Sequence, residues 1–309
     1  MTDYDIVVLG DYFFDQIFTG LPRFPALGCE TFADNLTTTG GAMFITAVAL
    51  SRLGGRAGWI GTFGNDPYSE LVYRLALEEG VDLALTRTLD HPFRRVTTSM
   101  PYEGERAFVT FADPDPEDMF DFWMAQLKSC NFRHVHLGGF VEVERLRPLA
   151  QHVRQRSATL SMDCQDGDFL SDPRACREAI GLVDFFIPNA REAMIITETD
   201  ELQDAIRTLT KMIPLVVVKD GARGSWVSSR DGLFHVPPIH AGRVIDTTGA
   251  GDCFNAGFLY GYLIERVPPQ TCARYGNICG GLSVTGIGGA THAPTHTELL
   301  EWLERFDDR

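Results

Sequence analysis

Short runs of apolar residues alternate along the chain with longer stretches in which apolar residues recur every three or four positions. The short runs predict buried strands at Ile6–Leu9, Gly58–Gly61, His134–Leu137, Thr159–Met162, Phe185–Ile187 and Leu215–Val218. The longer stretches predict helices at Ala42–Leu53, Tyr68–Glu79, Glu117–Lys128, Arg145–Gln155 and Glu201–Met212. This alternation predicts an α/β fold in which helices cover both faces of a parallel sheet. Ligands of such sheets bind beyond the carboxyl ends of the strands.

Two segments, residues 12–38 and 96–112, interrupt the alternation. The second has a turn at Glu103–Glu105 between two β-like runs. Because long structureless loops are uncommon in a compact domain, we expect both segments to form a small sheet that projects from the main body. No repeat, low-complexity tract or linker is apparent, so we expect residues 1–309 to form a single domain.

The chain has 309 residues, 44% of them hydrophobic, and a net charge of −15. This acidity argues against nucleic acid or an anionic membrane as a partner, because both are bound through clusters of Lys and Arg. The absence of a basic and apolar leader and of an apolar run of transmembrane length predicts a cytoplasmic protein. Seven cysteines without a C-x-x-C pair indicate reduced thiols rather than disulfides or a zinc site.

The most informative stretch runs from Asp246 to Asp252 and precedes an apolar run, Cys253–Ile264, that is expected to be helical. The small residues at 249–251 would leave the first N–H groups of this helix unshielded, so that they can hold a phosphate. The positive end of the helix dipole is expected to keep Asp252 ionised at neutral pH. An ionised carboxylate beside a phosphoryl group suits phosphoryl transfer to a hydroxyl. An ordinary capped helix after a turn is the alternative interpretation.

The stretch Asp246-Thr-Thr-Gly-Ala-Gly-Asp252 resembles the signature of the ribokinase-like, or PfkB, family of small-molecule kinases. The resemblance implies a doubly wound, mainly parallel sheet with helices on both faces. It also implies a small β-sheet lid that covers the sugar and forms a homodimer interface in some members. ATP and Mg²⁺ are implied, and K⁺ in many members. Asp252 would accept the hydroxyl proton, and three residues would stabilise the transferring phosphoryl group: Gly249, Ala250 and Gly251.

The resemblance also assigns acceptor binding to Asp252 and to residues near the N-terminus. Asp15 matches a family carboxylate that binds sugar hydroxyls through both oxygens. Gly40 and Gly41 match paired glycines that let a substrate approach the backbone. Ile45 departs from the family pattern, which usually has an Asn that bonds the sugar there, and it cannot replace those hydrogen bonds.

Nucleotide binding is implied for residues of the second half of the chain. Asn189 and Glu192 have the spacing of a helix-capping box, and the resemblance implies that they order Mg²⁺ and water around the ATP phosphates. Magnesium prefers water with one or two carboxylates, which suits Glu192. The further positions that match nucleotide contacts are Lys219, Gly221, Gly224, Gly251 and Asn277.

The glycine turn after Lys219 also fits a hairpin between Ser225–Ser228 and Leu233–Val236. Neither a Walker A motif nor a G-x-G-x-x-G after the first strand is present, which excludes P-loop and dinucleotide-binding interpretations. In many relatives a shell of largely backbone carbonyls holds a monovalent cation. The positions that match this potential K⁺ shell are Asp246, Thr248, Ser283, Gly286, Gly288 and His292.

These observations predict an ATP-dependent kinase that transfers the γ-phosphate to a hydroxymethyl group of a sugar or sugar-like molecule. A nucleoside kinase is the first alternative, favoured if Phe13, Phe44 and Ile45 provide an apolar wall for a base. A non-catalytic sugar or nucleotide sensor is a second alternative, disfavoured by Asp252.

A sugar-phosphate kinase would require a basic cluster for the second phosphate. The candidates for such a cluster are Arg94, Arg95 and Arg106, which surface charge on the lid explains equally well.

Overall fold

The central sheet of the computed structural model, which describes residues 3–103, 105–165 and 168–307, has eight strands. Their order is β14 (Gly232–Val236), β13 (Ser225–Ser229), β12 (Leu215–Lys219), β11 (Phe185–Ile187), β10 (Thr159–Asp163), β9 (Asn131–Leu137), β1 (Asp3–Leu9) and β4 (Ala57–Ile60). The strands from β4 to β12 pair in parallel, and β13 and β14 add an antiparallel edge. The predicted strands and the predicted hairpin are therefore confirmed.

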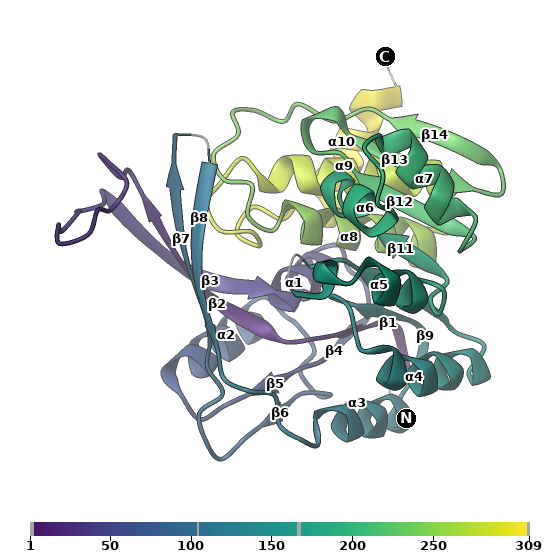
Figure 1. Ribbon diagram of the computed structural model, residues 1–309, viewed down its shortest axis with the longest axis horizontal. Coiled ribbons are helices and arrows are strands. Elements are labelled where there is room, and N and C mark those ends of the chain that lie inside the picture. Colours follow the sequence, from purple (N-terminus) through teal and green to yellow (C-terminus); the bar gives the residue numbers. More distant parts are fainter. Residues whose placement is uncertain (1–2, 104, 166–167, 308–309) are drawn as a thin grey trace.

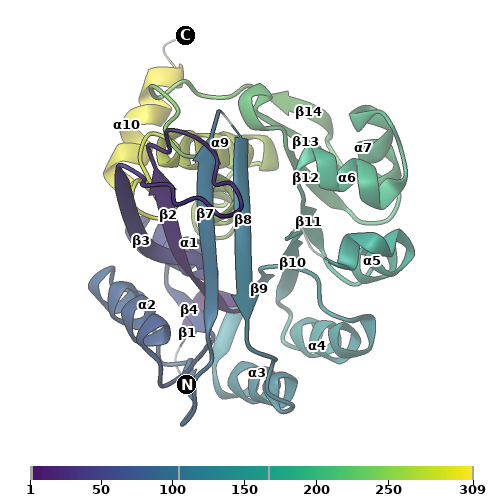
Figure 2. The same cartoon turned by 60° about the vertical axis from the view of Figure 1, so that its left-hand side comes forward.

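Helices cover both faces of this sheet (Figures 1 and 2). One face is covered by α1 (Met43–Arg52), α2 (Pro67–Glu78), α8 (Ala250–Tyr260), α9 (Pro269–Ser283) and α10 (His296–Asp307). The other is covered by α3 (Met119–Ser129), α4 (Val143–Gln155), α5 (Pro173–Ile180), α6 (Ala190–Thr197) and α7 (Leu202–Thr210). Both faces of β1 are buried, Ile6 and Val8 on one and Val7 and Leu9 on the other, which explains its continuous apolar run.

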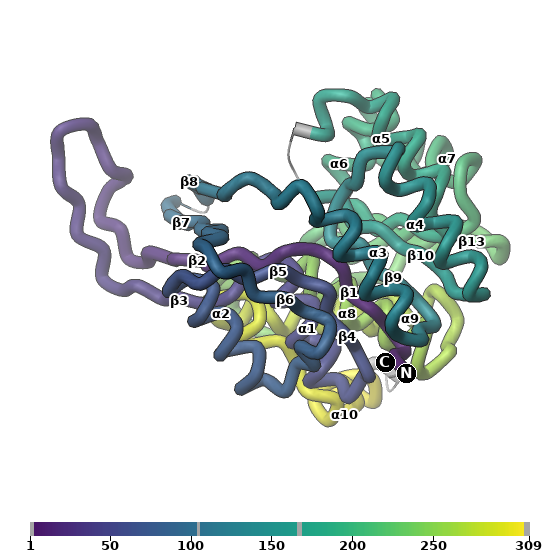
Figure 3. Tube along the Cα trace, turned by 90° about the horizontal axis from the view of Figure 1, so that it is seen from below, coloured from purple at the N-terminus to yellow at the C-terminus, as the bar shows by residue number. Residues whose placement is uncertain are grey.

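A second sheet has the order β3 (Asn35–Ala42), β2 (Tyr12–Thr19), β7 (Arg95–Tyr102) and β8 (Glu105–Ala112). It extends away from the main body, and the chain between β2 and β3 reaches furthest (Figures 1 and 3). The expectation that residues 12–38 and 96–112 form a small sheet is confirmed, although Gly104 of the expected turn lies outside the described residues. A short parallel pair, β5 (Thr62–Phe63) and β6 (Arg87–Thr88), lies near its base.

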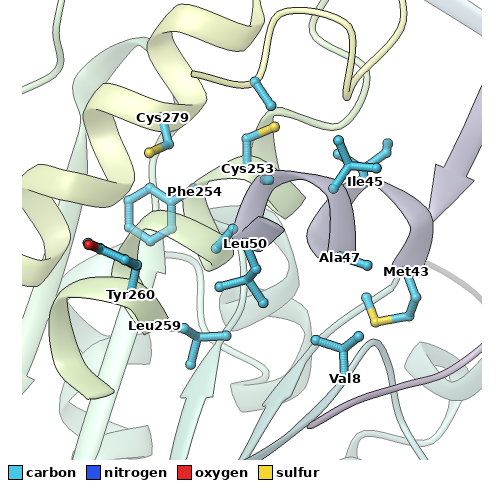
Figure 4. Packing of buried hydrophobic residues seen from close by; sticks show 14 of the residues in the cluster. Val8, Met43, Ile45, Ala47, Leu50, Cys253, Phe254, Leu259, Tyr260 and Cys279 are labelled. Atoms are coloured by element: carbon cyan, nitrogen blue, oxygen red, sulfur yellow. The ribbon is translucent and has the colours of Figure 1, made fainter. Parts of the chain in front are cut away.

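The helix expected at Cys253–Ile264 differs from the observed one at both ends. The observed helix, α8, begins at Ala250, inside the glycine motif, and ends at Tyr260, where a π-helical turn over Gly261–Glu265 follows. Its Cys253 and Phe254 pack beside Ile45 and Leu50 of α1 (Figure 4).

No helix within the described residues combines the length and the apolar character needed to cross a membrane. The seven cysteines are free; Cys29 is exposed and the other six are buried.

Candidate active site

The start of α8 has the geometry of an anion-binding site. Gly249 precedes the helix with φ +70°, a left-handed conformation that glycine adopts without steric cost. No side chain caps this helix start, whereas Asp66 caps α2 and Asp172 caps α5. No side-chain cap from the described residues therefore competes with an anionic ligand at this helix start, although Ala250 N donates to the carbonyl of Thr247 at 3.4 Å.

Ile45 supports this helix start from behind. A Cβ atom at Gly249 would lie 2.6 Å from Ile45 Cδ1, and one at Gly289 would lie 2.4 Å from the same atom. Ile45 itself is only 2% exposed. The side chain of Ile45 thus fills the space between two glycine loops, and its place beside the acceptor stays a prediction.

The substitution Gly249→Ala tests whether catalysis and stability depend on the backbone position at the start of α8. We expect kcat to fall at least tenfold and the free energy of unfolding to fall by about 1–3 kcal/mol, because the methyl group meets Ile45 and the left-handed backbone is strained. Enzyme assays and urea unfolding measure both effects. Gly28→Ala is the matched control, since Gly28 has φ +73° but no atom within 4 Å of the added Cβ. A kcat for Gly249→Ala within twofold of wild type would contradict the expectation.

Asp252 lies in the first turn of α8, and Thr46 Oγ1 donates a hydrogen bond to its Oδ1 at 3.4 Å. Burial raises the pKa of Asp252 from 3.8 to about 7, and the charge of Asp163 adds to this effect, while Lys219 opposes it. The expectation that the helix dipole keeps Asp252 fully ionised is therefore wrong. Desolvation outweighs the dipole, so Asp252 is divided between its two protonation states at neutral pH.

Lys219 lies at the end of β12 beneath the helix start. Its Nζ contacts both carboxylate oxygens of Asp163 at 2.8 Å and Asn255 Oδ1 at 3.2 Å. Asn255 Nδ2 donates to Asp163 Oδ2, which closes a buried triangle. A Cβ atom at Gly251 would lie 3.4 Å from Lys219 Nζ, so the ammonium group is adjacent to the expected phosphate position.

Sequence reasoning identified Lys219 but missed Asp163 and Asn255. The position of Asp163, directly after the expected strand Thr159–Met162, was the available signal. Burial alone would lower the pKa of Lys219, but the charges of Asp163 and Glu192 raise it above its usual value, so the ammonium group stays charged.

Asp15 and the paired glycines lie at the junction of the two sheets. A Cβ atom at Gly41 would lie 2.3 Å from Asp15 Oδ2, and one at Gly40 would lie 2.4 Å from Phe44 Cγ. Both glycines belong to β3 rather than to the start of α1, and neighbouring side chains fill the space where their own would be. Burial raises the pKa of Asp15 to about 7, with a further contribution from Asp246.

Asp246 joins the two loops that flank the helix start. Its Oδ1 accepts hydrogen bonds from Thr248 N and Oγ1, and its Oδ2 accepts one from Gly288 N at 3.0 Å. Arg106 of β8 reaches across from the second sheet and donates to Thr248 Oγ1 at 3.1 Å. The second sheet thus contacts the loop that leads into α8.

The remaining residues of the expected cation shell lie nearby but are not all directed at one point. The ring of His292 occupies the space beside Gly286, where a Cβ atom would lie 1.7 Å from His292 Cδ2. Ser283 Oγ donates to the carbonyl of Gly280 in its own helix.

Asn189 and Glu192 form a complete capping box. Glu192 N donates to Asn189 Oδ1 at 2.9 Å, and Asn189 N donates to Glu192 Oε2 at 2.7 Å. The capping interpretation is confirmed, and the carboxylate of Glu192 also acts on the charge of Lys219. No group of three or more His, Cys, Asp or Glu that could hold a metal ion is found among the described residues. Glu192 offers one carboxylate, and Mg²⁺ prefers water with one or two carboxylates.

The other expected nucleotide contacts meet at the end of β14. A Cβ atom at Gly224, which has φ +89°, would lie 2.2 Å from the carbonyl oxygen of Val236. Asn277 of α9 donates to the carbonyls of Val236 and Pro237 at 3.0 and 2.9 Å. The side chain of Asn277 thus fixes the chain after β14. Gly221 also has a left-handed backbone, with φ +55°, in the turn after Lys219.

A cavity of about 170 Å³ lies where β1 and β9 end, beside the first residue of α1. Its lining includes Asp11, Phe13, Asp115, Trp123 and Phe140. A larger hollow of about 330 Å³, beside Asp184 and Leu215, lies at the amino ends of β10 to β12, on the opposite edge of the sheet from α8's first turn.

Comparisons with known proteins identify the family and the fold. A family model described as pfkB family carbohydrate kinase matches residues 7–296. A Klebsiella pneumoniae fructokinase is 29% identical (87% of this chain and 92% of the relative), and a Haemophilus influenzae ribokinase is 26% identical (97% and 98%). An ATP-dependent ribose-1-phosphate kinase from Halopiger xanaduensis is 30% identical (87% and 88%). The structure of Arabidopsis thaliana ribokinase with ribose and ATP superposes with a TM-score of 0.80 at 21% identity (98% and 99%). The expected fold is confirmed.

Proposed function

The chain belongs to the pfkB family of carbohydrate kinases and is an ATP-dependent kinase of sugar-like molecules, and we propose that it transfers the γ-phosphate to a hydroxymethyl group. The observation that carries this proposal is the uncapped start of α8 with Asp252 in its first turn. An anion held there by the N–H groups of Ala250 and Gly251 is adjacent to a carboxylate that can accept a proton.

In the proposed reaction, Asp252 orients the acceptor hydroxyl and takes its proton as the new O–P bond forms. The transition state of phosphoryl transfer is loose, so positioning and charge stabilisation matter more than strong activation of the nucleophile. The N–H groups at 249–251 stabilise the charge of the transferring group, and Lys219 adds a positive charge beneath them. A bound Mg²⁺ would neutralise charge on the nucleotide phosphates, and Glu192 with Asn189 would hold it through water.

We propose that the nucleotide binds along the turn at Gly221 and Gly224 and beside Asn277. The left-handed turn and the chain after β14 form one wall, which the hydrogen bonds of Asn277 hold in place. A K⁺ ion is proposed beside the loops that Asp246 connects, with backbone carbonyls as ligands. The hydrogen bonds from Asp246 to Thr248 and Gly288 support a fixed arrangement of these loops.

The acceptor is proposed to lie between Asp15 and Asp252, with its distal part in the 170 Å³ cavity. A nucleoside is the second candidate acceptor, because Phe13, Trp123 and Phe140 line this cavity and can stack on a flat base. Ile45 does not contribute to this wall.

The second sheet is proposed to act as a lid, because Arg106 already connects it to Thr248. Exposed apolar residues on its strands also suit a homodimer interface; they include Leu36, Phe108, Val109 and Phe111. We propose a cytoplasmic location, which the seven unpaired cysteines favour.

The proposed function is tested by measuring ADP formation with a panel of sugars and nucleosides. We expect ADP to form in the presence of at least one acceptor. We also expect the transferred phosphate to be found on the hydroxymethyl group of that acceptor. Tight binding of these ligands without turnover would instead identify a sensor.

The pH profile follows from the pKa of about 7 for Asp252. Because only the ionised carboxylate accepts a proton, we expect kcat/KM to fall about tenfold per pH unit below pH 7 and to level off above it. The profile is measured with saturating ATP between pH 5 and pH 9, which extends about two pH units below and above that pKa. Asp15→Asn is the control variant, since Asp15 has a similar pKa. Its charge contributes to the raised pKa of Asp252, so its removal should move the acid limb to lower pH without abolishing it. An acid limb with its midpoint near 4 would contradict a buried base.

A further inference from the structure

An arginine at the end of α1 joins three parts of the chain. Arg52 Nε and Nη2 donate to the two carboxylate oxygens of Glu79 at 2.8 and 2.7 Å, which forms a bidentate pair. Its Nη1 donates to the carbonyl oxygens of Thr291 and Ala293 at 3.2 and 2.8 Å. The side chain is only 21% exposed. Arg52 therefore connects the ends of α1 and α2 to the chain that follows α9.

Residues 286–293, which follow α9, pack directly against the start of α8, and we call them the support loop. Gly288 N donates to Asp246 Oδ2 at 3.0 Å. A Cβ atom at Gly249 would lie 2.7 Å from the Cα atom of Gly289, so the backbones of these two glycines are in contact. Because close-packed groups transmit displacements, a shift of the support loop would move the backbone at the start of α8.

Hydrogen bonds inside the support loop connect its two ends. Thr291 N donates to the carbonyl of Gly288 at 2.7 Å, and Ala293 N donates to the carbonyl of Ala290 at 3.1 Å. The carbonyl of Thr291 in turn accepts a hydrogen bond from Arg52. The residue that Arg52 holds is therefore bonded to the residue that binds the loop before α8.

The same helix, α1, supports the loop at a second point. A Cβ atom at Gly289 would lie 2.4 Å from Ile45 Cδ1, and Cys253 Sγ of α8 lies 3.7 Å from the carbonyl oxygen of Gly289. Figure 4 shows Ile45 and Cys253 on the two helices. Ile45 and Arg52 are seven residues apart, which places them on the same side of α1. One helix thus holds the support loop both at Gly289 and at the carbonyls beyond it.

We propose that Arg52 is a positioning residue of the kinase reaction. It holds the support loop against Gly249 and so keeps the first N–H groups of α8 where they stabilise the transferring phosphoryl group. The guanidinium group suits this role, because one edge pairs with a carboxylate while the remaining nitrogen donates to two carbonyls. This inference rests on the proposed function, which has the phosphoryl group bound at the start of α8.

Arg52→Met tests this role, because it removes the hydrogen bonds and keeps most of the apolar length of the side chain. We expect kcat to fall about 10- to 100-fold, since small misplacements of groups that act on the transition state have effects of this size. The KM for the acceptor should change less than about threefold, because the proposed acceptor carboxylates, Asp15 and Asp252, are unchanged. A loss of stability alone would leave the kcat of the folded enzyme unaltered, so kcat is measured well below the unfolding temperature of each variant.

Arg177→Met is the matched control. Arg177 also pairs with a glutamate, Glu198, and donates to a backbone carbonyl, that of Ile196, but it joins α5 to α6 on the other face of the sheet. Its side chain is 30% exposed, similar to that of Arg52. We expect this variant to keep the kcat of the wild type. Equal losses of kcat in Arg52→Met and Arg177→Met would overturn the proposal.

Arg52→Lys provides a second variant in case Arg52→Met does not fold. It keeps the charge and the apolar stem, but one ammonium group cannot pair with Glu79 and also reach both carbonyls. We expect kcat to fall about three- to tenfold, together with faster hydrogen exchange in the support loop. Faster exchange with the kcat of the wild type would overturn the proposal.

Hydrogen–deuterium exchange separates the role of Arg52 from the kinase function. In Arg52→Met we expect at least about tenfold faster exchange of the amides of the support loop and of the start of α8, with Gly288 among them. Arg177→Met should accelerate exchange in α5 and α6 only. If this pattern appears but the wild type turns over no acceptor, the hold of Arg52 on the helix start stands and only the proposed function fails. If exchange in the support loop does not change, the proposal is overturned, whatever the activity.

Discussion

Asp252→Asn is expected to lower kcat by about 10²- to 10⁴-fold, the usual contribution of a general base. The amide has nearly the same shape and can still accept the hydrogen bond from Thr46, but it cannot take a proton. The affinity for ATP should change less than about threefold, because the N–H groups that hold the phosphate belong to the backbone. Steady-state kinetics and nucleotide titration measure the two quantities separately.

The stability of the same variant provides an internal check that it is folded. The pKa of Asp252 is raised on folding from 3.8 to about 7, so its ionisation destabilises the folded protein increasingly between these two values. Above pH 7 that cost is fully present in the wild type and absent from Asp252→Asn, which should therefore unfold at a higher temperature at pH 8. Asp200→Asn, on an exposed residue before α7, is the control for a change of charge. Retained turnover in Asp252→Asn would exclude Asp252 as the base.

The fold was predictable because its signals are local. Each central strand is apolar on both faces, and each helix shows an apolar stripe, so the order of elements follows from periodicity. The two segments of the second sheet stood out because they lacked this rhythm. The start of α8 at Ala250 and the end of β3 at Ala42 were harder to predict, because glycines fit a strand end, a turn or a helix start equally well.

The site was predictable only in part, because its side chains come together from distant elements. The Asp163–Lys219–Asn255 triangle joins β10, β12 and α8, and no short motif contains it. His134 and His136 are a second example of side chains whose contacts could not be predicted from the sequence. Both are fully buried in β9 and hydrogen-bond to Ser161 of the neighbouring strand, and burial lowers the pKa of His136 to about 4. In the sequence they are only polar interruptions of an apolar run.

Lys219→Met is expected to affect stability and catalysis through different partners. Removing the ammonium group leaves the carboxylate of Asp163 buried without its main counter-charge, which should lower the free energy of unfolding by about 3–5 kcal/mol. It also removes positive charge from beneath Gly251, so kcat should fall by about 10²- to 10³-fold. Lys211→Met, on an exposed lysine at the end of α7, is the control.

A double variant distinguishes the two effects. In Lys219→Met/Asp163→Asn the buried site is uncharged, and the Asn at 163 can still accept the hydrogen bond from Asn255. We expect most of the lost stability to return, because the unpaired carboxylate is gone, while kcat stays low because no cation lies next to the phosphate. Urea unfolding and kcat at saturating ATP are measured for the single and double variants. If kcat recovers together with stability, Lys219 serves only to neutralise Asp163 and contributes no charge to phosphoryl transfer.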